Sequence, residues 1–264
     1  MIVVLAGALC LYAFTGPFVS QRVVAGAPPR PARASGTSPD QAVRPAAPPA
    51  VTPADAAPPQ RPAPVREPRD ARARNPAAAF QRALEFHRAG DLENAVRAYR
   101  ALVARGELAA QSHNNLGLAY HQQGRLDAAA REFEHALARD PEYARAHNNA
   151  GVVLLAQGQV ERAMPRFRTA AELNPHDPDP IVNLALAHQA AGRRERARET
   201  LLSALGLSPH SAAAHYNLAV LYDQTGERTR AREHYRAFLE YRGAEYAARA
   251  ADVRERLAVL DRRH

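Results

Sequence analysis

The 264-residue chain contains no lysine and no tryptophan, and it has a single cysteine, Cys10. One cysteine excludes a disulfide framework within the chain and any metal site built from several cysteines of one chain. All 35 cationic side chains of the lysine and arginine class are therefore arginines. Aromatic residues make up only 6% of the chain, so most of its 46% hydrophobic content is alanine, leucine and valine. This composition favours helices over β-sheet.

The net charge of +8 is unevenly distributed along the chain. Residues 1–75 contain nine arginines and four acidic residues, whereas residues 76–264 contain 26 arginines and 23 acidic residues. The second part is nearly balanced, so the basic isoelectric point is weak evidence for a nucleic-acid partner.

Residues 1–21 predict a membrane-spanning helix. Residues 1–20 carry no charged side chain, and about 20 apolar residues are needed to cross a bilayer as a helix. We interpret this segment as a single-pass transmembrane anchor. The alternative is a cleavable signal peptide that ends at Ala25, although the usual basic amino-terminal region is missing. A lipoprotein signal at Cys10 is disfavoured because Leu9 stands where such signals have a small residue.

Residues 22–75 predict a disordered linker rich in proline, alanine and arginine. Within it, residues 27–75 contain thirteen prolines and thirteen alanines, and such a segment has too little apolar surface to offset the entropy of folding. Its basic stretches could alternatively contact anionic lipid or nucleic acid. The interleaved acidic residues favour a solvated tether.

The side of the membrane that the folded part faces is open from the sequence. Arg22, Arg30 and Arg33 follow the apolar segment, which by the positive-inside rule would place the folded part in the cytoplasm. The linker, however, resembles those of exported bacterial proteins. We therefore expect the soluble domain on the exported (periplasmic) side.

From Pro76 onward the sequence repeats every 34 residues without an insertion. Such a period indicates a stack of equivalent structural units. We number these units 1 to 5: 76–109, 110–143, 144–177, 178–211 and 212–245. Glycine occupies position 15 of every unit: Gly90, Gly124, Gly158, Gly192 and Gly226. Alanine occupies position 20: Ala95, Ala129, Ala163, Ala197 and Ala231. Position 8 is always small: Ala83, Gly117, Gly151, Ala185 and Ala219. Position 24 is always large: Tyr99, Phe133, Phe167, Leu201 and Tyr235.

This pattern predicts a helical hairpin in each unit. Small residues at positions 8 and 20 let two antiparallel helices approach closely, and the glycine at position 15 ends the first helix. Pro141, Pro175 and Pro209 at position 32 end the second helix in units 2 to 4. The pattern resembles the tetratricopeptide-repeat family. The resemblance implies an all-α, right-handed α-solenoid of five repeats over residues 76–245, and residues 246–264 read as an amphipathic C-terminal capping helix.

The same resemblance implies a binding groove. In this family the first helix of each unit lines the concave face, where positions 5, 6 and 12 point into the groove. A side-chain amide occupies position 6 of every unit: Gln81, Asn115, Asn149, Asn183 and Asn217. This row resembles the asparagine ladder of O-GlcNAc transferase and implies hydrogen bonds to the main chain of a peptide. The further groove residues that we predict are Asn114, Asn148, Tyr216, His121 and Gln189. Alternatively, the asparagines belong to the repeat template and bond locally.

The sequence offers no sign of catalysis. It contains no phosphate-binding loop, nucleotide fingerprint, nucleophile elbow or zinc-protease signature. His113, His147 and His215 share position 4, but equivalent residues of adjacent units lie too far apart to share one metal ion. We therefore predict no enzymatic activity, no cofactor, no metal and no small-molecule substrate.

The predicted function is that of a membrane-anchored adaptor whose groove binds a protein or peptide partner. Two alternatives remain: a self-assembling structural scaffold of a membrane complex, and a nucleic-acid-binding repeat protein. The second would use arginines such as Arg193, Arg194 and Arg230, which alternate with acidic residues along the second helices. Such alternation favours a solvated face, so a nucleic-acid partner is disfavoured.

Overall fold

The computed structural model describes residues 75–262, and every regular element in that range is helical. Its elements are α3 (Pro76–Arg88), α4 (Leu92–Ala104), α5 (Ala109–Gln122), α6 (Leu126–Arg139), α7 (Ala144–Ala156), α8 (Val160–Leu173), α9 (Asp179–Ala190), α10 (Arg194–Leu207), α11 (Ala212–Gln224), α12 (Arg228–Tyr241), the short 3₁₀ helix η1 (Ala244–Tyr246) and α13 (Ala247–Asp261). These eleven α-helices confirm the all-α repeat array.

The predicted membrane segment, residues 1–21, and the linker as far as residue 74 lie outside the described residues. Within residues 75–262, no helix combines the length and the apolar character that crossing a membrane requires.

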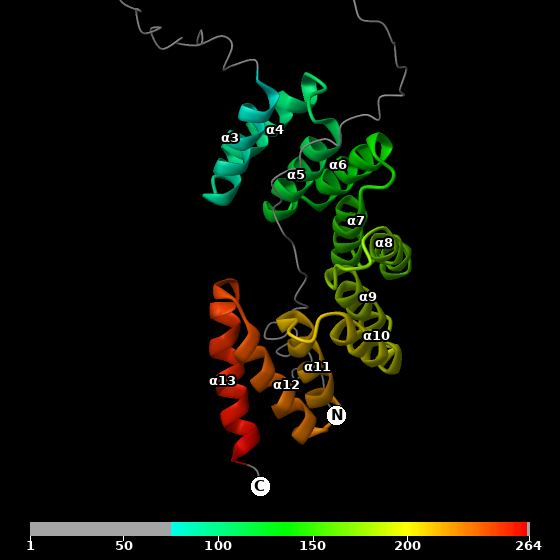
Figure 1. The fold of residues 1–264 in the computed structure, drawn as a ribbon, viewed down its shortest axis with the longest axis vertical. Coiled ribbons are helices and arrows are strands. Elements are labelled where there is room, and N and C mark those ends of the chain that lie inside the picture. The colour runs from blue at the N-terminus through cyan, green and yellow to red at the C-terminus, as the bar shows by residue number, and fades with distance from the viewer. Residues whose placement is uncertain (1–74, 263–264) are drawn as a thin grey trace, which may run out of the picture.

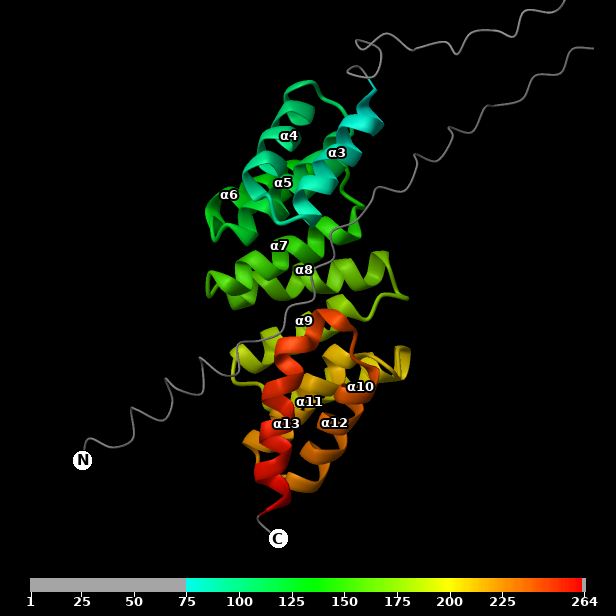
Figure 2. The ribbon, with the colours of Figure 1, turned by 90° about the vertical axis from the view of Figure 1, so that its left-hand side faces the viewer.

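The helices form a curved stack in which each pair packs on the next (Figure 1). Within a unit the first helix packs on the second, and the second packs on the first helix of the following unit. The first helices also contact one another directly, α5 with α7, α7 with α9 and α9 with α11. The two ends of the array, α3 and α13, lie on the same side in Figure 1, and Figure 2 shows the stack from that side. The first helices therefore line the inner side of the curve.

Glycine, asparagine and proline residues determine where the helices begin and end. The position-15 glycines have positive φ angles between 73° and 80°, which side chains with a Cβ rarely adopt. Asn75 caps α3 by accepting from the backbone N–H groups of Ala77 and Ala78 at 3.0 and 3.3 Å, with Pro76 in the first turn, where its missing N–H costs nothing. Local sequence thus sets where the helices begin and end.

Within each hairpin the small residue at position 8 faces the large residue at position 24. A Cβ placed on Gly117 would lie 2.7 Å from Cε1 of Phe133, and one on Gly151 would lie 2.6 Å from Cε1 of Phe167. Both phenylalanines are completely buried. The two units with glycine at position 8 are therefore those in which the helices carry a phenylalanine between them.

The last helix closes the stack over unit 5. Ala250, Val253, Leu257 and Leu260 of α13 are buried in the same cluster as the core of α11 and α12, whereas Ala247 at the start of this helix is exposed. This burial covers apolar surface that an open-ended array would leave in water.

We expect Gly151→Ala to lower the free energy of unfolding by about 1 kcal/mol, because forcing a methyl group against Phe167 costs more than the gain in helix propensity. Unit 4 shows the compatible combination, Ala185 with Leu201. The double variant Gly151→Ala/Phe167→Leu should therefore lose less stability than the two single variants added together. Denaturant unfolding of the four proteins measures this coupling, and strictly additive losses would refute the contact as the limiting factor.

Candidate functional site

The predicted groove residues lie on the first helices, but most of their side chains are buried. The four position-6 asparagines are between 0% and 5% exposed, whereas Gln81 at the start of the row is exposed. Asn114, Asn148 and Tyr216 at position 5 are also buried, and His121 and Gln189 at position 12 are half-buried. The row therefore lies within the inner wall of the array.

Two of the asparagines connect neighbouring units. Asn149 Nδ2 donates to Asn114 Oδ1 at 2.9 Å, and Asn183 Nδ2 donates to Asn148 Oδ1 at 2.9 Å. In each case position 6 of one unit reaches position 5 of the unit before it. These amide bonds are buried and join consecutive first helices directly.

The asparagines at the two ends of the row bond within their own helices. Asn115 Nδ2 donates to the carbonyl oxygen of Gln111 at 3.0 Å, and Asn217 Nδ2 donates to that of Ala213 at 2.8 Å. The reason lies in the preceding unit, where position 5 is Phe80 or Val182 and has no side-chain acceptor. The residue at position 5 therefore decides whether the next asparagine links two units.

Several polar atoms of this wall have no hydrogen-bond partner among residues 75–262. They are Asn114 Nδ2, Asn115 Oδ1 and Asn183 Oδ1, together with His121 Nδ1. Buried side-chain polar atoms usually do have a partner. The wall thus carries one donor amide, two acceptor oxygens and a ring nitrogen whose hydrogen-bonding capacity is unused.

A second set of links between units joins position 12 to position 13 of the next unit. His87 Nε2 lies 3.1 Å from Gln122 Oε1, and Gln189 Nε2 donates to Gln224 Oε1 at 3.2 Å. Burial lowers the pKa of His87, although its bond to Gln122 opposes the shift. Burial also lowers the pKa of His121. Both imidazoles are therefore neutral at pH 7, and the amide-lined wall gains no positive charge from them.

At the carboxyl-terminal end, α13 covers the wall. Arg249 Nη1 donates to Tyr216 Oη at 3.2 Å and its guanidinium lies 5.1 Å from the ring centre. Arg256 donates to both carboxylate oxygens of Asp223 at 2.6 Å. Burial raises the pKa of Tyr216. Tyr216, predicted as a groove residue, thus lies beneath the last helix and bonds to it. Sequence reasoning missed Asp223, Arg249 and Arg256, because the path of the last helix does not follow the 34-residue period.

The outer side of the array is a mixed-charge surface. Arg166 pairs with Glu134 at 2.7 Å, and Arg193 pairs with Glu161 at 2.7 Å. Arg193 was one of the candidate nucleic-acid contacts, and its charge is compensated here. Within residues 75–262, no group of three or more His, Cys, Asp or Glu side chains is arranged to hold a metal ion.

Comparison with known proteins agrees with the helical repeat array seen in the structure. A family model described as tetratricopeptide repeat matches residues 80–134, 122–178 and 182–251, and a second model of that description matches residues 154–205. No curated protein matches the chain.

Similar solved structures match nearly their whole length to about two thirds of this chain. The pilF protein of Pseudomonas aeruginosa is 24% identical with a TM-score of 0.59, over 72% of this chain and 90% of that one. A thermophilic tetratricopeptide-repeat protein in Thermus thermophilus is 21% identical with a TM-score of 0.58, over 70% and 98%. MamA from Desulfovibrio magneticus is 22% identical with a TM-score of 0.54, over 63% and 94%. At these identities the likeness concerns the fold alone.

We expect the amide links between units to contribute more to stability than the local amide bonds. Asn149→Ala leaves Asn114 Oδ1 buried without its donor, which should cost about 1 to 3 kcal/mol. Asn217→Ala is the matched control, because it also replaces a position-6 asparagine but removes a bond to a carbonyl of its own helix, and we expect a loss of about 0.5 to 1.5 kcal/mol. Urea unfolding measures both, and equal losses would show that the link between units contributes nothing extra.

Proposed function

This chain belongs to the tetratricopeptide-repeat family, and we propose that it is a membrane-anchored adaptor that binds an extended peptide along its amide-lined inner wall. Proteins of this family typically serve as scaffolds for protein–protein interaction and typically lack enzymatic activity. The proposal concerns the residues of this chain that would hold the peptide and the place where it would do so.

The observation that carries the proposal is the unused hydrogen-bonding capacity of the wall. Within the part of the chain that the structure describes, Asn114 Nδ2 is a donor without an acceptor, and Asn115 Oδ1 and Asn183 Oδ1 are acceptors without a donor. An extended peptide presents one N–H and one C=O per residue, proline excepted. Its main chain can therefore supply the complementary groups. Because these amide atoms are buried, the side chains must first turn toward the groove, and the resulting bonds would give affinity with little dependence on the peptide's sequence.

The hydrogen bonds of the wall suggest which asparagines are free to turn toward a peptide. The bonds of Asn115 and Asn217 reach a carbonyl four residues earlier in the same helix, so turning these side chains leaves the neighbouring units joined. Asn149 and Asn183 hold neighbouring units together. We therefore assign Asn115 and Asn217 the main peptide contacts, and Asn149 and Asn183 the spacing between them.

The remaining predicted residues flank this row. Gln81 is exposed at the amino-terminal end, and His121 and Gln189 are half-buried one helical turn or more along the same helices. We propose that they select among the peptide's side chains. Asn114 and Asn148 act beside their bonded asparagines, and Tyr216 marks the end of the groove where α13 begins to cover it.

The test begins with crosslinking and purification of partners from native membranes, followed by titration of the full-length chain with a fluorescent peptide from the crosslinked segment. Each neutral hydrogen bond contributes about 0.5 to 1.5 kcal/mol. Asn115→Ala/Asn217→Ala should therefore weaken binding by about 5- to 150-fold, and alanine at all four position-6 asparagines should weaken it further.

Asn94→Ala is the matched control, because Asn94 is an asparagine of a second helix that bonds to Asp91. It should bind the peptide as the wild-type chain does. Unchanged affinity in the four-asparagine variant would instead assign these residues to the repeat template alone.

A self-assembling scaffold is the second candidate, and one observation favours it. Leu173, Leu207 and Tyr241 are exposed to 38%, 38% and 36%, and all three stand at position 30 of consecutive units. A row of apolar side chains on the second helices could join two copies of the chain. Oligomerisation that rises with concentration and is untouched by the asparagine variants would favour this candidate.

We further propose that residues 1–21 anchor the chain and that residues 22–75 hold the repeats away from the bilayer, on the exported side. Support comes from the uncharged apolar segment and from the composition of the linker. A reporter enzyme that is active only after export, fused to the carboxyl terminus, should be active and should sediment with membranes. An inactive reporter would place the repeats in the cytoplasm, and a full-length uncleaved chain in the soluble fraction would refute the anchor.

A further inference from the structure

Two histidines of unit 5 face each other across its hairpin. His215 on α11 and His234 on α12 have their Nδ1 atoms 2.9 Å apart, and the ring centres are separated by 5.2 Å at an interplanar angle of 38°. His215 is 9% exposed, and His234 is half-buried. The pair therefore sits at the edge of the core, within reach of small solutes.

The protonation of His215 follows from its other nitrogen. Nε2 of His215 lies 2.9 Å from the carbonyl oxygen of Pro209, and because a carbonyl can only accept, Nε2 carries the hydrogen. In the neutral ring Nδ1 is then bare, with its lone pair directed at His234. A histidine that binds a metal through one ring nitrogen commonly donates the hydrogen of its other ring nitrogen to a backbone carbonyl, as Nε2 of His215 does here.

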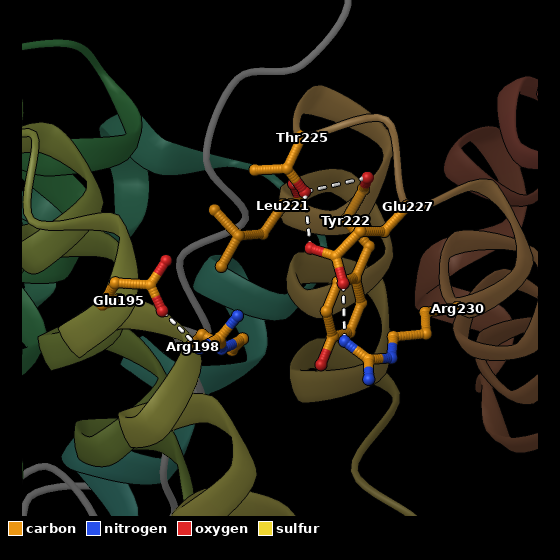
Figure 3. Close-up of polar contacts among 7 residues, drawn as sticks. All are labelled: Glu195, Arg198, Leu221, Tyr222, Thr225, Glu227 and Arg230. Carbon is orange, nitrogen blue, oxygen red and sulfur yellow. Dashed lines mark hydrogen bonds and ion pairs between the residues drawn. The ribbon is translucent and has the colours of Figure 1, made fainter.

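Neighbouring rings fix the orientation of both imidazoles. The ring of His234 stacks on Tyr222 at 5.6 Å and 17°, and the ring of His215 lies against Tyr241 at 5.6 Å. Tyr222 is itself held by the guanidinium of Arg230, 5.5 Å from its ring centre. Figure 3 shows the bonds behind this contact: Arg230 donates to Glu227, and the hydroxyl group of Thr225 bonds to Glu227 and to the carbonyl of Tyr222.

We propose that the Nδ1 atoms of His215 and His234 form a two-histidine site for a late first-row divalent metal ion of the Cu²⁺ type, with water completing the coordination. Binding requires His234 to carry its proton on Nε2 instead of Nδ1, a change of tautomer that alters no net charge. The site is independent of the peptide groove.

The present separation of the nitrogens, which is that of a hydrogen bond between them, can be compared with the separation that each coordination geometry needs. With metal–nitrogen bonds of about 2.0 to 2.1 Å, nitrogens 2.9 Å apart subtend about 90° at the ion. A tetrahedral ion would need them about 3.4 Å apart. Right angles belong to tetragonal coordination, which Cu²⁺ and Ni²⁺ adopt, and of the two Cu²⁺ binds nitrogen ligands more tightly.

Units 2 and 3 provide comparisons at the same two repeat positions, 4 and 23. His113 and Glu132 stand there in unit 2, with Nδ1 and Oε2 2.7 Å apart. In unit 3, Nε2 of His147 lies 2.9 Å from the carbonyl oxygen of Pro141 and its Nδ1 has no partner, but position 23 is Arg166. Unit 3 therefore has half of the proposed site.

The test is titration of the purified full-length chain with Cu²⁺ alone at pH 7.5, followed by equilibrium dialysis and electron paramagnetic resonance. His215→Ala and His234→Ala should each bind one Cu²⁺ ion fewer than the wild-type chain and lose the hyperfine splitting from the two nitrogens. His147→Ala is the matched control and should bind as many ions as the wild type.

Arg166→His supplies the converse test by placing a histidine at position 23 of unit 3, the position that His234 occupies in unit 5. We expect this variant to bind one additional ion, and we expect the gain to vanish in His147→Ala/Arg166→His. The proposal is overturned if folded His215→Ala or His234→Ala binds as many ions as the wild type. Should both alanine variants unfold, as judged by circular dichroism, Arg166→His decides, since the absence of a gain overturns the proposal.

Discussion

The close contact between positions 8 and 24 is the constraint on which this array depends. In units 2 and 3 the aromatic rings of Phe133 and Phe167 occupy the space that a Cβ at Gly117 or Gly151 would need. In these two hairpins the buried phenylalanine thus packs directly against the bare backbone of the first helix, whereas units 1 and 5 combine alanine at position 8 with tyrosine at position 24. Because the five units have similar hairpins, each unit packs on the next in a similar way. The position-6 asparagines therefore recur at equivalent places on successive first helices.

Much of this architecture could be predicted from the sequence because its causes are local. The 34-residue period, the glycine that ends each first helix and the small and large residues inside each hairpin are visible without coordinates. The structure adds the partner of each side chain across units. Asn149 and Asn114 were both predicted as groove residues, but their mutual bond depends on the rotation of one unit relative to the next. The contact of Tyr216 with α13 was likewise invisible, because the path of the last helix is not periodic.

The side-chain amides of the inner wall can form hydrogen bonds either to a neighbouring unit or to a bound peptide. Bonds between asparagines hold the step between units, and unused amide atoms are what a peptide would engage. In unit 4, Val182 at position 5 removes the acceptor that Asn217 would otherwise use, and Phe80 does the same for Asn115. A single apolar residue at position 5 of one unit thus decides the bonding of the asparagine at position 6 of the next. For this reason Asn115 and Asn217 bond within their own helices, whereas Asn149 and Asn183 bond to the preceding unit.

The clamped last helix gives the array a direction. Beyond its buried apolar face, α13 is joined to α11 through Arg249 and Arg256 and to α12 through Arg232 and Asp261. At the other end, α3 packs on α4 and bonds to α5 through His87 and Gln122. In a stack whose units gain stability only from their neighbours, a change at one end is felt mainly by the adjacent unit. Breaking the bonds of α13 would therefore loosen the carboxyl-terminal hairpin while leaving the packing of units 1 to 3 as it is.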